Sequence, residues 1–273
     1  MKSIVISLFA ESFIHPGSGQ DNGAIDLPVA RERVTGYPFI AGSSLKGAWR
    51  DYARSNNLSK QEQDTLFGEQ NQAGQLLISD ARLQLLPVRS LNHSYCWLTS
   101  PLALERLARD FKRAFHNDHI DLLNITLGTG KFLGHPTNGN LFLEERCFEP
   151  AGEINPAIIN TLKKLIPNSS AAKRLEKQLV ILHDEDYKWF TQNALSIQAR
   201  NVLDDDTKQS NNLWYEETLP PDTLMVSLTS QRTAQGNALE TLVKQIIQCP
   251  YLQVGGNETV GQGWFNIHVG AQP

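Results

Sequence analysis

The sequence predicts a mixed α and β fold, because stretches with strand character and stretches with helical periodicity alternate along its 273 residues. Strands are predicted at 2–9, 75–79, 94–98, 141–148, 224–229, 251–254 and 264–269. Helices are predicted at 44–55, 59–67, 101–115, 155–166, 170–182 and 237–248. The strands do not follow each helix at short, even spacing, as a doubly wound parallel sheet requires. The order therefore favours a ferredoxin-like α+β core, in which helices cover one face of a sheet.

Composition sets the broad class. With 40% hydrophobic residues, the chain can bury a substantial core in one large domain or in a domain with insertions. Its formal net charge of −4 and its pI near 6.0 argue against a bulk basic nucleic-acid binder, although net charge does not describe a local surface. The sequence shows no apolar run that could span a bilayer and no charged-then-apolar leader. We expect a soluble, cytoplasmic protein.

The cysteines do not indicate a metal or disulfide framework. Cys96, Cys147 and Cys249 are scattered without CxxC spacing. They are most simply core thiols.

The predicted helix at 44–55 has two distinct faces. Its apolar residues, at i, i+3, i+4, i+7 and i+8, are Leu45, Ala48, Trp49, Tyr52 and Ala53, which can pack on a sheet. Lys46, Arg50 and Arg54 share a different face. Basic residues also outnumber acidic ones over 31–54, so the charge is locally polarised.

The start of this helix is a candidate anion site. Ser43 or Ser44 can cap the helix, because a serine hydroxyl accepts from amides that the first turn leaves unpaired. A helix amino terminus carries partial positive charge, and Lys46 would extend a phosphate site along several phosphates. The alternative is an ordinary amphipathic helix with solvated cations, which the spacing alone favours.

Two further segments have clear local signals. The helix at 101–115 begins with Ser100 before Pro101, and its apolar face predicts core packing. Asn138-Gly139 is a tight-turn signal and predicts a hairpin near 128–148, with 115–140 as an exposed insertion.

Two glycine-rich stretches, 15–26 and 253–264, stand far apart in the sequence. The first follows a predicted strand but does not match a Walker or dinucleotide fingerprint. Glycines allow positive φ and close approach of a polymer backbone, and successive amides can cup a phosphate. Two strands joined by a glycine turn would look the same.

Several motifs together resemble a known family. They are 23–28 with Arg31, Tyr37-Pro38 leading to 42–47, 86–91, 99–101, 215–220 and 255–264. In this combination the chain resembles the RAMP superfamily of CRISPR RNA-binding proteins, and within it the repeated backbone subunits of type III-B, or Cmr, effector complexes. The resemblance extends from the first strand to the last. It says little about individual residues between about 116 and 140 and between 167 and 212.

The resemblance implies a fold and a set of partners. The fold is a modified ferredoxin-like, RRM-like palm, a single domain over 1–273 with insertions near 115–140 and 167–215. A thumb hairpin at about 195–216 would displace a base pair through an apolar wedge at Val202 and Leu203. The partners are a guide CRISPR RNA, a target RNA, further copies of the chain in a helical filament, and other Cmr subunits. A subunit repeated along a variable guide must hold phosphates and 2′-hydroxyls rather than base edges.

The resemblance also implies a site of RNA cleavage at regular intervals. The family's catalytic aspartate falls on Asp26, which could accept the 2′-hydroxyl proton or hold a divalent ion, Mg²⁺ or Mn²⁺. The residue alone favours an aspartate that closes a turn on its own backbone. His15, Glu216 and Glu217 are secondary candidates, and since strand neighbours point to opposite faces, at most one glutamate should face RNA.

Guide RNA would contact the two motif regions already described. These contacts are predicted at Ser43, Ser44, Lys46, Arg50, Arg54, Arg31, Gly255, Gly256, Gly261 and Gly263. For the glycines, a structural turn before the strand at Trp264 is the alternative. His116, His119 and 204–206 resemble metal-ligand spacings, but solvated loop groups explain them better and we assign them no chemistry.

Three functions of different classes remain open. The first is a guide-RNA-binding ribonuclease subunit, and the second is the same scaffold as an inactive, purely structural filament protein. The third is an unrelated metabolic α+β enzyme whose glycine loops bind a phosphorylated metabolite.

Overall fold

The computed structural model describes residues 2–20, 23–116, 125–135 and 138–270. Within these ranges, twelve strands form one mixed sheet, in which β15, β16, β1, β14, β6, β7, β11, β8, β10 and β9 are neighbours in that order. The short strands β2 and β5 pair with β6 and β14. The bounds are β1 Ser3–Ala10, β2 Phe39–Ile40, β5 Leu76–Ile78, β6 Ala81–Arg89, β7 Tyr95–Thr99, β8 Lys131–Gly134, β9 Leu141–Leu143, β10 Arg146–Gly152, β11 Leu179–Leu182, β14 Leu224–Gln231, β15 Tyr251–Gln253 and β16 Trp264–Val269.

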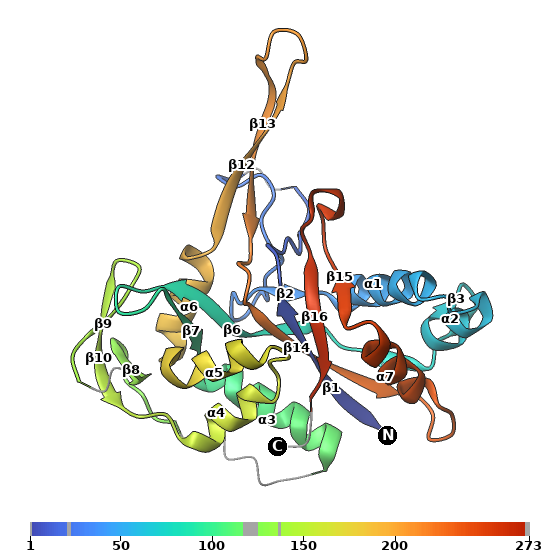
Figure 1. Ribbon diagram of the computed structural model, residues 1–273, viewed down its shortest axis with the longest axis horizontal. Helices are drawn as coiled ribbons and strands as arrows, with labels where there is room; N and C mark the ends of the chain where they lie inside the picture. Colours follow the sequence, from blue (N-terminus) through green and yellow to red (C-terminus); the bar gives the residue numbers. More distant parts are fainter. Residues whose placement is uncertain (1, 21–22, 117–124, 136–137, 271–273) are drawn as a thin grey trace.

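Helices lie around this sheet, and two separate two-stranded hairpins complete the described fold (Figure 1). The helices are α1 Gly42–Ser55, α2 Lys60–Phe67, α3 Pro101–Phe115, α4 Pro156–Lys163, α5 Ser169–Gln178, α6 Asp184–Asn193 and α7 Ala238–Gln248. The hairpins are β3 Gly68–Glu69 with β4 Gln72–Ala73, and β12 Ser196–Leu203 with β13 Ser210–Thr218. In the described part of the chain, no helix has both the length and the apolar character needed to cross a membrane.

Helices cover both faces of the sheet, so the expectation of a one-sided sheet is wrong. On β1, Ile6 and Leu8 pack in a cluster with α1 and α7, whereas Val5 and Phe9 pack in a second cluster with α3, α4 and α5. Alternate residues of a strand point to opposite faces. All residues of β14 and β11 are buried, as expected for central strands that are covered on both sides.

The helix α1 confirms the predicted apolar face but corrects its predicted cap. Leu45 and Trp49 are buried against the sheet. The helix begins at Gly42, its cap residue is Ala41, and no side chain caps it, so Ser43 and Ser44 lie inside the first turn. The amide of Gly42 instead donates to Asp80 Oδ1 at 2.7 Å. A carboxylate from the connection between β5 and β6 therefore replaces the local serine.

Other elements match or depart from prediction in definable ways. The helix α3 has the predicted bounds, and the Ser100 hydroxyl accepts from the amide of Ala103. The predicted helix at 170–182 ends at Gln178, because the four apolar residues that follow form the buried strand β11. The cysteines divide: Cys96 is a core thiol, whereas Cys147 is exposed, contrary to expectation.

The hairpin predicted near 128–148 is wrong in its pairing. The strand β8 lies between β11 and β10, and it pairs in parallel with β10. The strand β9 pairs with β10 instead, across a turn in which Glu144 has a positive φ of 49°. The tight turn of this region is therefore six residues later than the Asn138-Gly139 signal.

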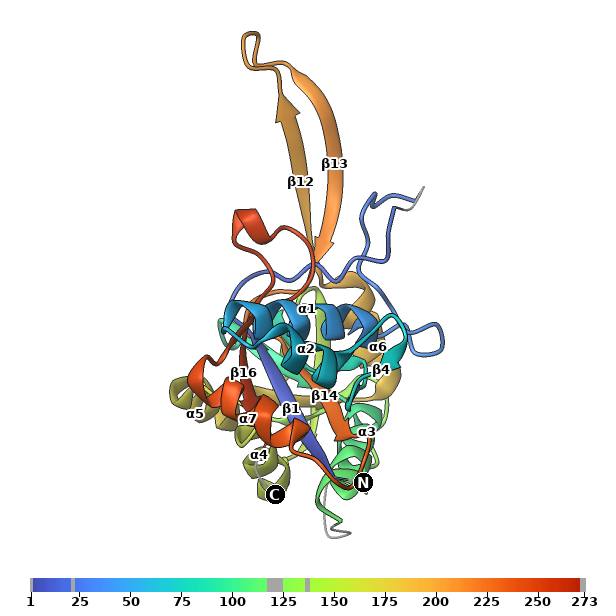
Figure 2. The ribbon, with the colours of Figure 1, turned by 90° about the vertical axis from the view of Figure 1, so that its right-hand side faces the viewer.

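The strands β12 and β13 pair as an antiparallel hairpin in the region where the sequence predicts one, 195–216. It projects from one end of the molecule, away from both chain termini (Figures 1 and 2). Two segments that are distant in sequence flank its base in Figure 2: the loop between β1 and β2, and the turn between β15 and β16. These three segments contain most of the residues singled out in the sequence.

Candidate functional site

Asp26 lies at the base of the projecting hairpin. The amide of Leu27 donates to the carbonyl oxygen of Tyr215 at 3.1 Å, and the amide of Glu217 donates to the carbonyl oxygen of Leu27 at 3.0 Å. Leu27 thus adds a short parallel bridge to β13. The amide of Tyr215 then donates to Asp26 Oδ2 at 2.7 Å. The carboxylate is partly exposed, and within the described residues its Oδ1 has no hydrogen-bond partner.

Glu217 binds the same loop from its other side. Only 3% of this residue is exposed. Its Oε2 accepts from the amide of Val29 at 3.0 Å, and its Oε1 accepts from Arg31 Nη2 at 2.6 Å. Arg31 Nη1 also donates to the carbonyl oxygens of Gly36 and Thr191, at 3.1 and 2.6 Å. Both side chains are therefore engaged by protein groups.

Glu216 points to the opposite side of the hairpin, as alternation along a strand requires. It is 1% exposed, and its Oε1 accepts from Asn257 Nδ2 in the glycine turn. Arg200 Nε lies 3.4 Å from Glu216 Oε2, and His15 Nδ1 lies 3.7 Å from Oε1. His15 Nδ1 donates to the carbonyl oxygen of Glu217 at 2.8 Å. In a neutral ring this bond leaves Nε2 as an acceptor.

The glycine turn between β15 and β16 packs on the backbone around His15. The amide of Gly256 donates to the carbonyl oxygen of His15, and the amide of Gly263 donates to that of Phe13. Gly255 has a φ of 96°, and a Cβ there would lie 2.6 Å from the carbonyl oxygen of His15. Gly261, with a φ of 80°, faces open space. Protein geometry thus requires Gly255, whereas Gly261 leaves room for a ligand.

The predicted cationic stripe of α1 is divided by its partners. Arg50 Nη2 donates to the carbonyl oxygen of Gly68, which attaches α1 to the hairpin of β3 and β4. Arg54 pairs with Asp51 at 2.8 Å. Lys46 is exposed and has no ion-pair partner among the described residues. An open groove of about 630 Å³ runs between this face and the β3–β4 hairpin, and Ser43, Lys46, Gly47 and Arg50 line it.

The hairpin exposes apolar side chains along its length. Val202 and Leu203, the predicted wedge, are 48% and 50% exposed. Ile197, Leu213 and Tyr215 are exposed as well, and the prediction missed them. Their cross-strand pairs put these three on the same side as Glu217, the side of the Asp26 loop. Their alternating positions in the two strands are the sequence signal that could have found them.

The described residues supply only part of a site for the expected divalent ion. Among the described residues, no three His, Cys, Asp or Glu side chains come together as a cation cage. Asp26 supplies a single carboxylate, so an ion there would take further ligands from RNA phosphates and water, as Mg²⁺ commonly does. In the tip, Asp204 Oδ1 accepts from the amides of Asp206 and Thr207. His119 lies outside the described residues.

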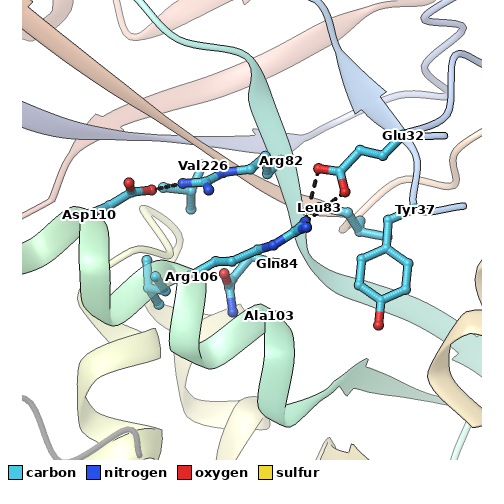
Figure 3. A pocket seen from close by; sticks show the side chains of 10 residues that line it. Glu32, Tyr37, Arg82, Leu83, Gln84, Ala103, Arg106, Asp110 and Val226 are labelled. Atoms are coloured by element: carbon cyan, nitrogen blue, oxygen red, sulfur yellow. Dashed lines mark hydrogen bonds and ion pairs between the residues drawn. The ribbon is translucent and has the colours of Figure 1, made fainter. Parts of the chain in front are cut away.

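A polar layer between α3 and β6 holds the loop from behind (Figure 3). Arg106 on α3 donates to both oxygens of Glu32, at 3.0 and 2.7 Å, and Arg82 on β6 pairs with Asp110. The enclosed space of about 10 Å³ holds at most about one water molecule. Burial raises the pKa of Tyr37, beside this layer, to about 12. The space is too small for a substrate, so we assign the layer a structural role.

These features define a mixed α and β protein with a hairpin that projects from a large sheet, and with a carboxylate at its base. The chain belongs to the RAMP superfamily, which it matches over residues 10–266. It is 30% identical over 285 residues to the CRISPR system Cmr endoribonuclease Cmr4 of Pyrococcus furiosus, a match that covers 98% of this chain and 95% of that protein.

Solved structures support the same placement. The crystal structure of oligomeric Cmr4 from Pyrococcus furiosus has a TM-score of 0.80 and 26% identity, over 99% of this chain and 98% of that one. A chain in the cryo-EM structure of the type III-B Cmr-beta complex bound to cognate target RNA also has a TM-score of 0.80, with 22% identity over 98% of this chain and 97% of that one. At this lower identity the likeness bears on the fold alone.

Proposed function

We propose that this chain is a repeated guide-RNA-binding backbone subunit of a type III-B CRISPR effector complex, and that it cuts target RNA paired to the guide at regular intervals. Similarity to Cmr4 over almost the whole chain supports the class of activity. The observation that carries the proposal is the position of Asp26, whose carboxylate is bonded to the base of the projecting hairpin through one oxygen and is open at the other.

In this proposal the main body is the ferredoxin-like, RRM-like palm and the β12–β13 hairpin is the thumb. Exposed apolar residues on the hairpin, including Val202 and Leu203, would enter the guide–target duplex and displace a base pair. The freed target nucleotide would no longer be held in A-form geometry. Its 2′-oxygen could then align with the adjacent phosphate opposite the leaving 5′-oxygen.

Asp26 is the proposed catalytic residue. The amide of Tyr215 fixes one carboxylate oxygen, and the other can accept the proton of the attacking 2′-hydroxyl. A bound Mg²⁺ or Mn²⁺ would supply stabilisation of charge on the phosphate. On the opposite side of the hairpin base, the carbonyl oxygen of His15 accepts from the amide of Gly256, and Glu216 accepts from Asn257. They would order that turn near the RNA.

Guide RNA would lie along the glycine turn and the groove of α1. Lys46 is the best-placed phosphate contact, because its ammonium is exposed and unpaired within the described residues. Amides of the glycine turn add neutral donors for phosphate oxygens. Sequence choice is left to base pairing with the guide. The partners are therefore guide RNA, target RNA, further copies of the chain in a filament and other subunits of the complex, in the cytoplasm where these RNAs occur.

Substitution of Asp26 tests the proposal. We expect the subunit, assembled with its complex and a guide, to convert labelled complementary RNA into a ladder of evenly spaced products. Asp26→Asn should abolish the ladder, because the amide oxygen can still accept from Tyr215 but cannot take up the proton. The control is Glu153→Gln, a carboxylate-to-amide change at an exposed position away from the hairpin.

The outcome separates cleavage from scaffolding. Normal assembly with no ladder in Asp26→Asn supports the assigned chemistry. Unchanged cutting by Asp26→Asn would contradict it. Assembly on guide RNA with no cutting by the unmodified protein would favour the alternative, an inactive RNA-binding filament subunit.

A further inference from the structure

A buried ion pair lies behind Asp26 and joins its loop to the hairpin. Residues Asp26 to Val29 have no helix or complete strand of their own. The first half of this segment is held by the backbone bonds of Leu27 with β13. The second half depends on Glu217, through the bond from the amide of Val29 at 3.0 Å.

Arg31 fixes Glu217 in the orientation that this bond needs. Its Nη2 lies 2.6 Å from Glu217 Oε1, so each carboxylate oxygen has one donor. The same guanidinium donates to the carbonyl oxygens of Gly36 in the loop and Thr191 on α6. Charge-assisted bonds of this geometry are stronger and more directional than neutral ones. Glu217 is almost fully buried, so water does not compete for it.

We infer that Arg31 and Glu217 act as one positioning pair for Asp26, rather than as an RNA contact and a catalytic carboxylate. The inference rests on the proposed function of Asp26 and adds the residues that hold it in place. The pair connects three segments, namely the loop, β13 and α6, at the point where the hairpin leaves the body. The bonds of both side chains go to groups of the protein itself.

The pair makes a distinctive kinetic prediction. Loss of a positioning group lowers the rate of the chemical step at saturating substrate, whereas loss of an RNA contact weakens binding. A displacement of about 1 Å at a reacting group can cost about 100-fold in rate. We therefore expect Glu217→Ala to lower the single-turnover cleavage rate constant about 100-fold, with the dissociation constant for target RNA unchanged.

A double-mutant cycle tests whether the two residues act together. Arg31→Ala should also lower the rate constant, and the double variant should be no slower than Glu217→Ala, because residues that act as a unit are not additive. Glu217→Gln, which keeps one acceptor for the amide of Val29, should lie between wild type and Glu217→Ala. If Glu217→Ala fails to fold, Glu217→Gln takes its place in the test. The control is Glu176→Ala, which removes one half of the exposed Lys163–Glu176 pair.

Hydrogen exchange gives a readout that does not depend on cleavage. In the free protein, Glu217→Ala and Glu217→Gln should increase exchange at the amide of Val29, and Asp26→Asn should not. Independent effects of Arg31 and Glu217, a weakened affinity with an unchanged rate, or unchanged exchange at Val29 would overturn the inference. Absence of a ladder with the unmodified protein would instead refute the proposed function, and the exchange measurement would still decide the role of the pair.

Discussion

Three cations on α1 show how much a residue depends on its neighbours. Lys46, Arg50 and Arg54 are evenly spaced and the sequence treats them alike. In the fold, Arg50 supports the β3–β4 hairpin, Arg54 pairs with Asp51, and only Lys46 points into the groove without an ionic partner among the described residues. The partners of Arg50 are the carbonyl oxygen of Gly68 and, at 3.5 Å, Asp64 Oδ1. Both lie outside α1, and no spacing rule along this helix could have indicated them.

Lys46 should therefore account for more RNA affinity than Arg54. We expect Lys46→Ala to weaken binding of single-stranded RNA and to reduce the slope of log affinity against log salt by about 0.7, the value for one phosphate contact on a single strand. Arg54 does not line the groove, so Arg54→Ala should leave both quantities unchanged. Filter binding across a salt series measures both variants. Equal losses for the two would argue against this groove as the RNA path.

The carboxylates of the site also show how far the sequence can predict the role of a single residue. The sequence motif pointed to Asp26, and its openness at one oxygen fits that prediction. Glu216 and Glu217 are neighbours in one strand, so alternation correctly predicted that they diverge. It could not predict that both are buried, since Asn257, His15 and Arg31 come from segments far away in the chain.

Elements with a strong period were predicted well, and those with mixed environments were not. The helices α1 and α3 each bury one apolar stripe, which the periodicity revealed. The long central strand β6 was missed even though Ala81, Leu83 and Leu85 alternate with Arg82 and Gln84, because Leu86 and Pro87 break this pattern after five residues. Arg82 faces the polar layer against α3, where it pairs with Asp110. A proline inside an alternating run lowers the strand signal, although this strand lies centrally in the sheet.

The helix α1 also contains a glycine that the helix itself does not need. Gly47 is exposed in the helix interior, and an added Cβ would meet no atom within 4 Å. Gly47→Ala should raise the free energy of unfolding by about 0.5–1 kcal/mol, because glycine in a helix loses more backbone entropy than alanine. Urea unfolding at 25 °C measures this change.

A matched control and a measurement of RNA binding test whether Gly47 serves RNA binding. Gly42→Ala should destabilise the protein, since its Cβ would lie 2.8 Å from the carbonyl oxygen of Ile78. Gly47 lines the groove with Lys46. A variant that is more stable but binds RNA less tightly would indicate that this glycine allows close approach of the strand. Lower stability of Gly47→Ala would contradict the prediction.

At the scale of the whole molecule, the two-sided sheet was the principal surprise. Single-sequence periodicity identifies which face of a helix is apolar, but it does not say on which side of a sheet the helix packs. The second layer, made of α3, α4 and α5, became evident only from the two residue sets of β1. The mixed α and β class could be predicted from the sequence, whereas this arrangement depends on long-range contacts.

Four buried or partly buried tyrosines should make the whole fold sensitive to alkali. Burial raises the pKa of Tyr37 to about 12 and raises those of Tyr52, Tyr95 and Tyr187. The unfolded chain loses these protons first, near pH 10, so the stabilisation is complete below pH 10 and is lost as the pH rises toward the folded values. For Tyr37 alone, the stability lost by pH 12 should be about 2 kcal/mol.

Thermal unfolding between pH 8 and pH 12 checks this expectation. Tyr37→Phe should lose less stability above pH 10 than the unmodified protein does. Tyr251→Phe, at an exposed position on β15, should follow the unmodified protein. Parallel curves for all three proteins would show that the Tyr37 phenol does not contribute.

The bridge between Leu27 and β13 has a consequence for an array of these chains. It attaches the Asp26 loop directly to the β12–β13 hairpin. Each copy in an array would therefore carry its own hairpin and its own carboxylate at a fixed separation. The distance between successive cuts would then be set by the distance between neighbouring subunits, and it would not depend on the nucleotide sequence of the target. Such an array would need no sequence motif in its target, only a guide RNA long enough to bind several copies.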